Sequence, residues 1–199
     1  MRRTPNRPSI ATLLATGIPS LAMAHTGTGH VDGLLQGFAH ALGGLDHLLA
    51  MTAVGLLAGR LGGPSLWHLP VAFVAMTALG MLAGITGMAL PFVETAITTS
   101  LVIFGLLLVA PRSGTLVTAL IVGLSGLFHG HAHGNEAATT INGIAYAGGL
   151  LTVTALLHAC GAIAALTLLR LHRVQGNAAL QISGGLIAGA GLGLFAGLL

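Results

Sequence analysis

Histidine is the side chain with the clearest chemical potential in this chain, and five of the ten histidines lie in two short clusters. The first cluster reads HALGGLDH, from His40 to His47, and includes Asp46. The second reads HGHAHGNE, from His129 to Glu136. Neutral imidazole and carboxylate together suit divalent nickel, cobalt, zinc, copper or iron. Both clusters are therefore candidate metal sites. A proton relay through histidine and aspartate, or a purely structural polar network, is the alternative.

The first cluster has helical spacing. His40 and His47 are seven residues apart, which is about two turns of an α-helix, so on a continuous helix they share one face. Asp46 is turned about 100° from His47 on the same helix. A carboxylate that accepts a ring N–H orients a metal-bound histidine and raises its basicity. We therefore expect Asp46 to face the same polar cavity or to hold a neighbouring imidazole.

The second cluster lies at the end of another apolar segment. His129, His133 and Glu136 fall at positions i, i+4 and i+7, so they also share one face of a continuous helix. His131 points elsewhere on such a helix, and a partly unwound end is the alternative because glycines flank it on both sides. The pattern therefore favours His129, His133 and Glu136 as ligands, and His131 is the weakest candidate ligand of this cluster.

Three further residues are candidates on their own. His158 lies alone in an apolar segment, where an ionisable group is a functional hypothesis by default, and a packing contact between helices is the alternative. Glu94 begins another segment, and it is interpreted either as an aid to ion entry or as a charge that stabilises a helix start. Ser125 lies in Gly-Leu-Ser-Gly, a G-x-S-G pattern like that of rhomboid-type serine proteases. An intramembrane hydrolase with Ser125 as nucleophile and His158 as base is therefore an alternative function.

The elements that position these residues are expected to be membrane-spanning helices. The chain is 54% apolar and 6% charged with a mean hydropathy of +0.94, whereas a soluble domain is about 25% charged. Apolar runs of about 20 residues recur, which is the length of a helix that crosses a bilayer. The fold class is therefore an all-α polytopic membrane bundle. About six spans are predicted, at residues 33–59, 66–87, 90–110, 115–134, 138–169 and 178–199.

Residues 1–24 have the pattern of a cleavable signal peptide. Positive residues precede a short apolar core, and Ala22-Met23-Ala24 is an A-x-A cleavage signature, with an uncleaved signal anchor as the alternative. Residues 25–199 then form a single transmembrane helical domain whose mature N-terminus is periplasmic. On this topology every arginine lies at a cytoplasmic end, as the positive-inside bias expects. We therefore expect the protein in the inner (plasma) membrane of a bacterium.

Composition excludes two classes of function. The positive charge comes from seven scattered arginines without any lysine, whereas a nucleic-acid binder clusters its basic residues on one face. We therefore expect no nucleic-acid partner. A nucleotide-driven motor is also excluded, because its Walker A motif requires a lysine. Any transport is expected to be facilitated diffusion or coupling to an ion gradient.

Both clusters resemble motifs of the HupE/UreJ family, membrane proteins associated with hydrogenase and urease gene clusters and regarded as nickel permeases. One family motif is similar to H-P-x-x-G-x-D-H, which His40 to His47 matches except that Ala41 replaces the proline and removes an expected kink. The other family motif resembles F-H-G-x-A-H-G-x-E and is matched by Phe128 to Glu136. The segment 90–105 is also similar, and the likeness covers nearly the whole mature chain.

The resemblance implies a permease that takes up nickel for hydrogenase or urease, and not an enzyme. Ni²⁺ is then the transported substrate, with Co²⁺ as the other metal that fits, and no cofactor is tightly bound. The lipid bilayer and hydrogenase or urease maturation proteins are the implied partners. The residues it implies are His40, Asp46, His47, His129 and His133. We expect Glu136, His133 and His129 to collect the ion and pass it deeper, to the first cluster. A metal-binding assembly partner that does not transport the ion is the remaining alternative.

Overall fold

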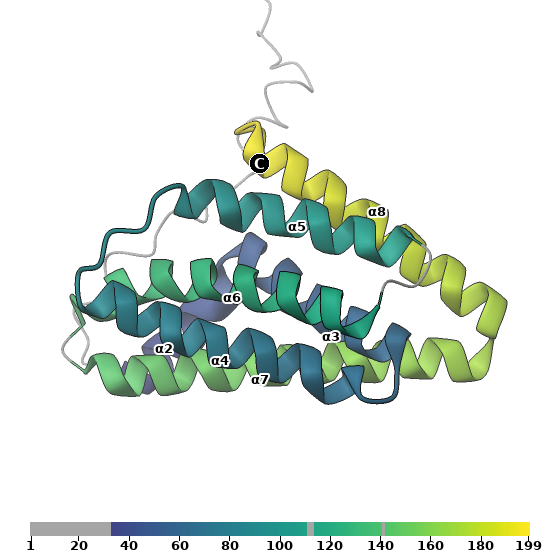
Figure 1. The fold of residues 1–199 in the computed structure, drawn as a ribbon, viewed down its shortest axis with the longest axis horizontal. Coiled ribbons are helices and arrows are strands. Elements are labelled where there is room, and N and C mark those ends of the chain that lie inside the picture. The colour runs from purple at the N-terminus through teal and green to yellow at the C-terminus, as the bar shows by residue number, and fades with distance from the viewer. Residues whose placement is uncertain (1–32, 111–113, 141) are drawn as a thin grey trace, which may run out of the picture. The chain divides into compact units, whose positions relative to one another are not determined.

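The computed structural model describes residues 33–110, 114–140 and 142–199, and every regular element in these ranges is an α-helix. The all-α prediction is therefore confirmed for this part of the chain. The predicted signal peptide, residues 1–24, lies outside the described residues. The helices are α2 (Gly33–Gly43), α3 (Leu45–Leu61), α4 (Ser65–Ile85), α5 (Val93–Val109), α6 (Thr115–Ala137), α7 (Gly143–Leu171) and α8 (Arg173–Phe195) (Figure 1).

Four of the described helices, α4, α6, α7 and α8, are long and apolar enough to cross a membrane. The consecutive helices α2 and α3 pass the same test as a pair but are bent by 84°, and α5 is apolar with 17 residues. A helix of that length spans about 25 Å, slightly less than the roughly 30 Å of a hydrocarbon core. The chain is therefore a helical membrane protein whose described residues contain four helices able to span a membrane, or five if the bent pair is one span, and the count of six stays a prediction.

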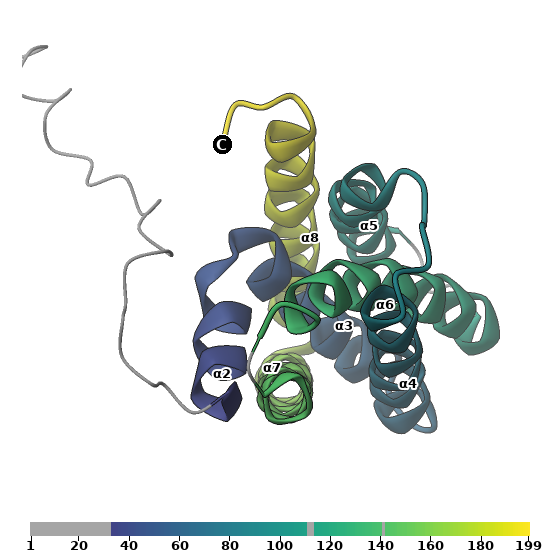
Figure 2. The same ribbon diagram turned by 90° about the vertical axis from the view of Figure 1, so that its left-hand side faces the viewer.

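Helix α3 is the central element of the bundle. It contacts each of the other described helices, and most of its residues from Ala50 to Arg60 are buried. Figure 2 shows α3 surrounded by α2, α7, α4, α5 and α8. Because α3 begins next to the HALGG segment, the centre of the bundle is continuous with the first histidine cluster.

The span predicted over residues 33–59 is broken, so the expectation of one helical face that carries both His40 and His47 is wrong. Gly44 has an extended backbone (φ −91°, ψ 120°) and separates α2 from α3. Two consecutive glycines, Gly43 and Gly44, favour a break at this point because glycine has a low helix propensity. The Asp46 carboxylate accepts a hydrogen bond from the backbone N–H of His47 (2.8 Å), which satisfies one free donor at the start of α3.

Helices α4 and α6 pack through a glycine face. The spacing of Gly126, Gly130 and Gly134 predicts a close helix–helix contact, and the structure confirms it. A Cβ atom on Gly130 would collide with the backbone of Thr77, and the other two glycines meet the α4 backbone in the same way. Figure 1 shows α4 and α6 running side by side. The backbone of α6, which carries the second histidine cluster, is thus held directly against α4.

Candidate metal site

Four imidazole rings from α2, α3 and α6 lie in sequence, and we call them the histidine row: His40, His133, His47 and His129. The ring centroids of successive members are 5.0, 4.3 and 5.0 Å apart. His40 is partly exposed, whereas His129 is completely buried. The two clusters therefore form one continuous constellation. The expectation that the first cluster lies deeper than the second is wrong, because His40 is at the outermost end of the row.

Glu136 joins the two clusters at the exposed end of the row. Its Oε2 atom accepts hydrogen bonds from His40 Nε2 (2.9 Å) and from the Tyr146 hydroxyl (2.8 Å). His133 Nδ1 lies 3.4 Å from the same oxygen. One ligand atom from each of His40, His133 and Glu136 lies within 4.8 Å of the other two. These three residues, which come from α2 and α6, could hold a divalent ion in place of the present hydrogen bonds.

Asp46 orients the third member of the row. Its Oδ1 atom lies 2.9 Å from His47 Nδ1, and an ionised carboxylate can only accept, so His47 carries its proton on Nδ1. The other nitrogen, Nε2, is buried and has no hydrogen-bond partner among the described residues. A carboxylate on one side and a free lone pair on the other is the arrangement of a metal-ligating histidine.

Ser100 on α5 orients the innermost member in the same way. Its hydroxyl donates to the backbone oxygen of Ile97 (2.6 Å), and its oxygen lies 3.0 Å from His129 Nε2. Because the single hydroxyl proton is used for Ile97, His129 must donate from Nε2. Its Nδ1 lone pair is then buried and without a partner among the described residues, as is one nitrogen of His133. Unpaired buried lone pairs need an explanation, and a coordinated cation supplies one.

The HupE / UreJ protein family model matches residues 13–194 of the chain. The chain belongs to the HupE/UreJ family. Protein HupE of Rhizobium leguminosarum bv. viciae is 44% identical over 187 residues, which are 94% of this chain and 96% of that protein. No solved structure matches the chain significantly. The family is associated with hydrogenase and urease maturation, and it is not a family of enzymes.

The hydrolase alternative does not fit this HupE/UreJ protein. The Ser125 hydroxyl donates to the backbone oxygen of Ile121 (2.9 Å), which is a common bond for serine within a helix. Among the described residues neither nitrogen of His158 has a hydrogen-bond partner, so Ser125 and His158 do not form a nucleophile–base pair. The His158 ring packs against Phe73 instead.

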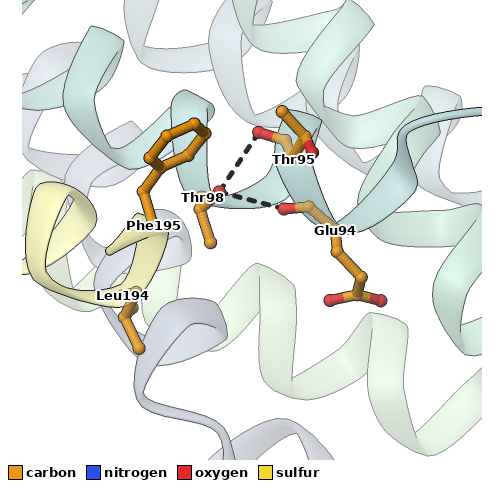
Figure 3. A pocket seen from close by; sticks show the side chains of 5 residues that line it. All are labelled: Glu94, Thr95, Thr98, Leu194 and Phe195. Atoms are coloured by element: carbon orange, nitrogen blue, oxygen red, sulfur yellow. Dashed lines mark hydrogen bonds between the residues drawn. The ribbon is translucent and has the colours of Figure 1, made fainter. Parts of the chain in front are cut away.

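Two other candidates of the HupE/UreJ chain lie outside the histidine row. His131 points away from it, as its helical position predicts, and its Nε2 atom donates to the backbone oxygen of Met88 (2.6 Å). Glu94 lines a pocket of about 250 Å³ between α5 and α8. In Figure 3 the Thr98 hydroxyl is directed at backbone oxygens, while the Glu94 carboxylate has no hydrogen bond or ion pair with any described residue. A role for either residue as a ligand stays a prediction.

Sequence reasoning missed two partners of the row in this HupE/UreJ protein, Tyr146 and Ser100. Tyr146 is the single tyrosine of the chain, and a tyrosine buried in an apolar helix needs a partner for its hydroxyl. That signal could have marked Tyr146 but not its partner. Ser100 is located in the segment that resembles the family, but one serine in an apolar run has no local pattern that indicates a contact with α6.

Proposed function

We propose that this protein is a permease for a divalent transition metal ion, with Ni²⁺ as the cargo and Co²⁺ as the other ion that the same ligands fit. The observation that supports this proposal is the histidine row, with its carboxylate end and its three buried, unpartnered ring nitrogens. A cysteine-free set of imidazole and carboxylate ligands suits Ni²⁺ and Co²⁺ better than Cu⁺. Uptake of the metal then supplies hydrogenase or urease.

The row suggests how the ion enters. Glu136 and His40 are accessible at one end and form the first site, together with His133. His133 reaches Glu136 through Nδ1, while its Nε2 atom is buried on the way to His47 and His129. Successive sites built from similar ligands allow an ion to leave each site without a large energetic step, which permeation requires.

The sidedness of the proposed route follows from charge. Helix α3 begins at the row with Asp46 and ends with Arg60, whose guanidinium is buried and donates to the backbone oxygens of Leu107 and Leu108. With arginines at the cytoplasmic ends, the row lies on the periplasmic side of a bacterial inner membrane. The mature N-terminus is on the same side, and residues 25–199 act as a single transmembrane domain.

The test is accumulation of radioactive Ni²⁺ and Co²⁺ in cells that lack their own high-affinity nickel uptake. Wild-type protein is compared with His133→Ala and Glu136→Gln, and with His68→Ala, a control histidine that is exposed on α4. We expect uptake with the wild type and the control, and a loss with both row variants. Equal accumulation in all four, or none above empty cells, refutes the proposal. Binding by purified wild-type protein without accumulation in cells would instead identify an assembly partner.

A further inference from the structure

His158 is a buried histidine that the histidine row does not use. It lies in α7 with 1% of its surface exposed, and neither ring nitrogen has a hydrogen-bond partner among the described residues. A neutral imidazole has one N–H and one lone pair, and burying both without partners carries a free-energy cost. A leucine at this position would avoid that cost, so packing alone does not account for the histidine.

The ring of Phe73 connects His158 with the inner end of the row. Phe73 and His158 pack edge to face, with centroids 5.1 Å apart at 87°. The same Phe73 ring lies 5.6 Å from the ring of His129. One side chain of α4 is therefore in contact with two buried imidazoles, one from α6 and one from α7. His158 is therefore the next imidazole after His129, on the opposite contact of the Phe73 ring.

The helices around His158 leave little room for anything larger than an ion. Gly55 of α3 lies against the backbone oxygen of His158, and Gly161 lies against α3 in turn, so the two helices are in backbone contact at this level. One turn before His158, the Thr154 hydroxyl lies 3.4 Å from the sulfur of Met51. Imidazole and thioether are both ligands of transition metals, whereas a sugar or an amino acid needs a cavity.

We propose that His158 is an inner binding station for the same divalent transition metal ion, separated from His129 by the ring of Phe73. The inference rests on the proposed function and extends it beyond the row. An ion that leaves His129 exchanges one imidazole ligand for another once the Phe73 side chain turns aside. The unpartnered lone pair of His158 is then accounted for, since it binds the ion while the ion resides there.

The test is a comparison of His158→Leu with wild-type protein, and with His172→Leu as a matched control at an exposed histidine. Two quantities are measured: the initial rate of Ni²⁺ uptake in cells, and the thermal stability of the purified protein in detergent. Replacing an unsatisfied buried polar group by an apolar side chain is neutral or stabilising. We therefore expect uptake to fall at least about tenfold, since even the loss of a group that only orients a metal ligand typically costs about 10- to 100-fold, while the melting temperature stays the same or rises.

The outcomes separate the inference from the proposed function. Normal uptake by His158→Leu overturns the inference and leaves the permease intact. Reduced uptake with a lowered melting temperature also overturns it, because the histidine is then structural. Binding of Ni²⁺ to purified His158→Leu through the row, at wild-type affinity but with a lower stoichiometry, supports it. Absence of uptake in the wild type refutes the proposed function itself.

Discussion

Replacing Ser100 by alanine removes the acceptor that faces His129 Nε2 in the centre of the bundle. Two responses are open to the buried imidazole. It can keep its proton on Nε2, which then has no partner, or it can move the proton to Nδ1, which removes the lone pair on the other side of the ring. Both responses weaken metal binding, because ligation requires a neutral ring with its lone pair in place.

The magnitude follows from two independent estimates. Removal of a partner that orients a metal-bound histidine typically lowers metal affinity by about 10- to 100-fold, which is roughly 1.4 to 2.7 kcal/mol. An unpaired buried N–H costs about 1 to 3 kcal/mol. The two ranges overlap, and both residues are almost fully buried, with 2% exposure for Ser100 and none for His129. We therefore expect Ser100→Ala to bind Ni²⁺ at least about tenfold more weakly.

The measurement is a Ni²⁺ titration of the purified protein in detergent. Ser125→Ala is the matched control, because Ser125 is also a buried helical serine whose hydroxyl donates to a backbone oxygen, that of Ile121. It differs from Ser100 in having no histidine partner. The reasoning is refuted if Ser100→Ala and Ser125→Ala bind Ni²⁺ with the same affinity.

Three more predictions follow from the same structure. Gly130→Ala places a Cβ against the backbone of Thr77 and should lower the free energy of unfolding in detergent by about 1 to 3 kcal/mol. The control Gly189→Ala places its Cβ in open space and should leave the stability unchanged. Equal melting temperatures of the two variants would contradict the close contact. His131→Ala should reduce thermal stability, because the hydrogen bond from His131 to the backbone of Met88 is structural and such a bond typically contributes about 0.5 to 1.5 kcal/mol. The Ni²⁺ affinity of this variant should stay within about threefold of the wild type. A larger loss of affinity would identify His131 as a ligand. Uptake at subsaturating Ni²⁺ should fall as the pH is lowered from 7.5 to 5.5, since protons compete with the ion for the lone pairs of the imidazole ligands; rates that do not change would argue against imidazole ligation.

Helical spacing was sufficient to predict the second cluster. His129, His133 and Glu136 lie on one continuous helix, and His131 points away, as the 3.6-residue period requires. The same rule failed for His40 and His47, because the chain is not helical at Gly44. Sequence shows that a glycine pair is present, but the bend of 84° depends on how α2 and α3 pack against the rest of the bundle.

The spacing of residues along each helix could not predict that the two histidine clusters come together in one row. It depends on the register between α2, α3 and α6, which side-chain spacing along one helix does not specify. The contacts of Tyr146 with Glu136 and of Ser100 with His129 are of the same kind. Each joins residues from different helices, so only the assembled bundle shows that the carboxylate and the buried ring have these partners.

The glycine face between α4 and α6 also limits how the protein can move. Where two helices touch through their main chains, no side chain can change rotamer to let one slide past the other. We expect α4 and α6 to move as one rigid body during any transport cycle, carrying His129 and His133 with them. Helix α2 donates His40 to the same site and is held against α7 in the same way, since Gly37 meets the backbone of Tyr146 and Gly149 meets the backbone of Leu34. Any opening of the ion route would then move packed helices together, and not α2 alone.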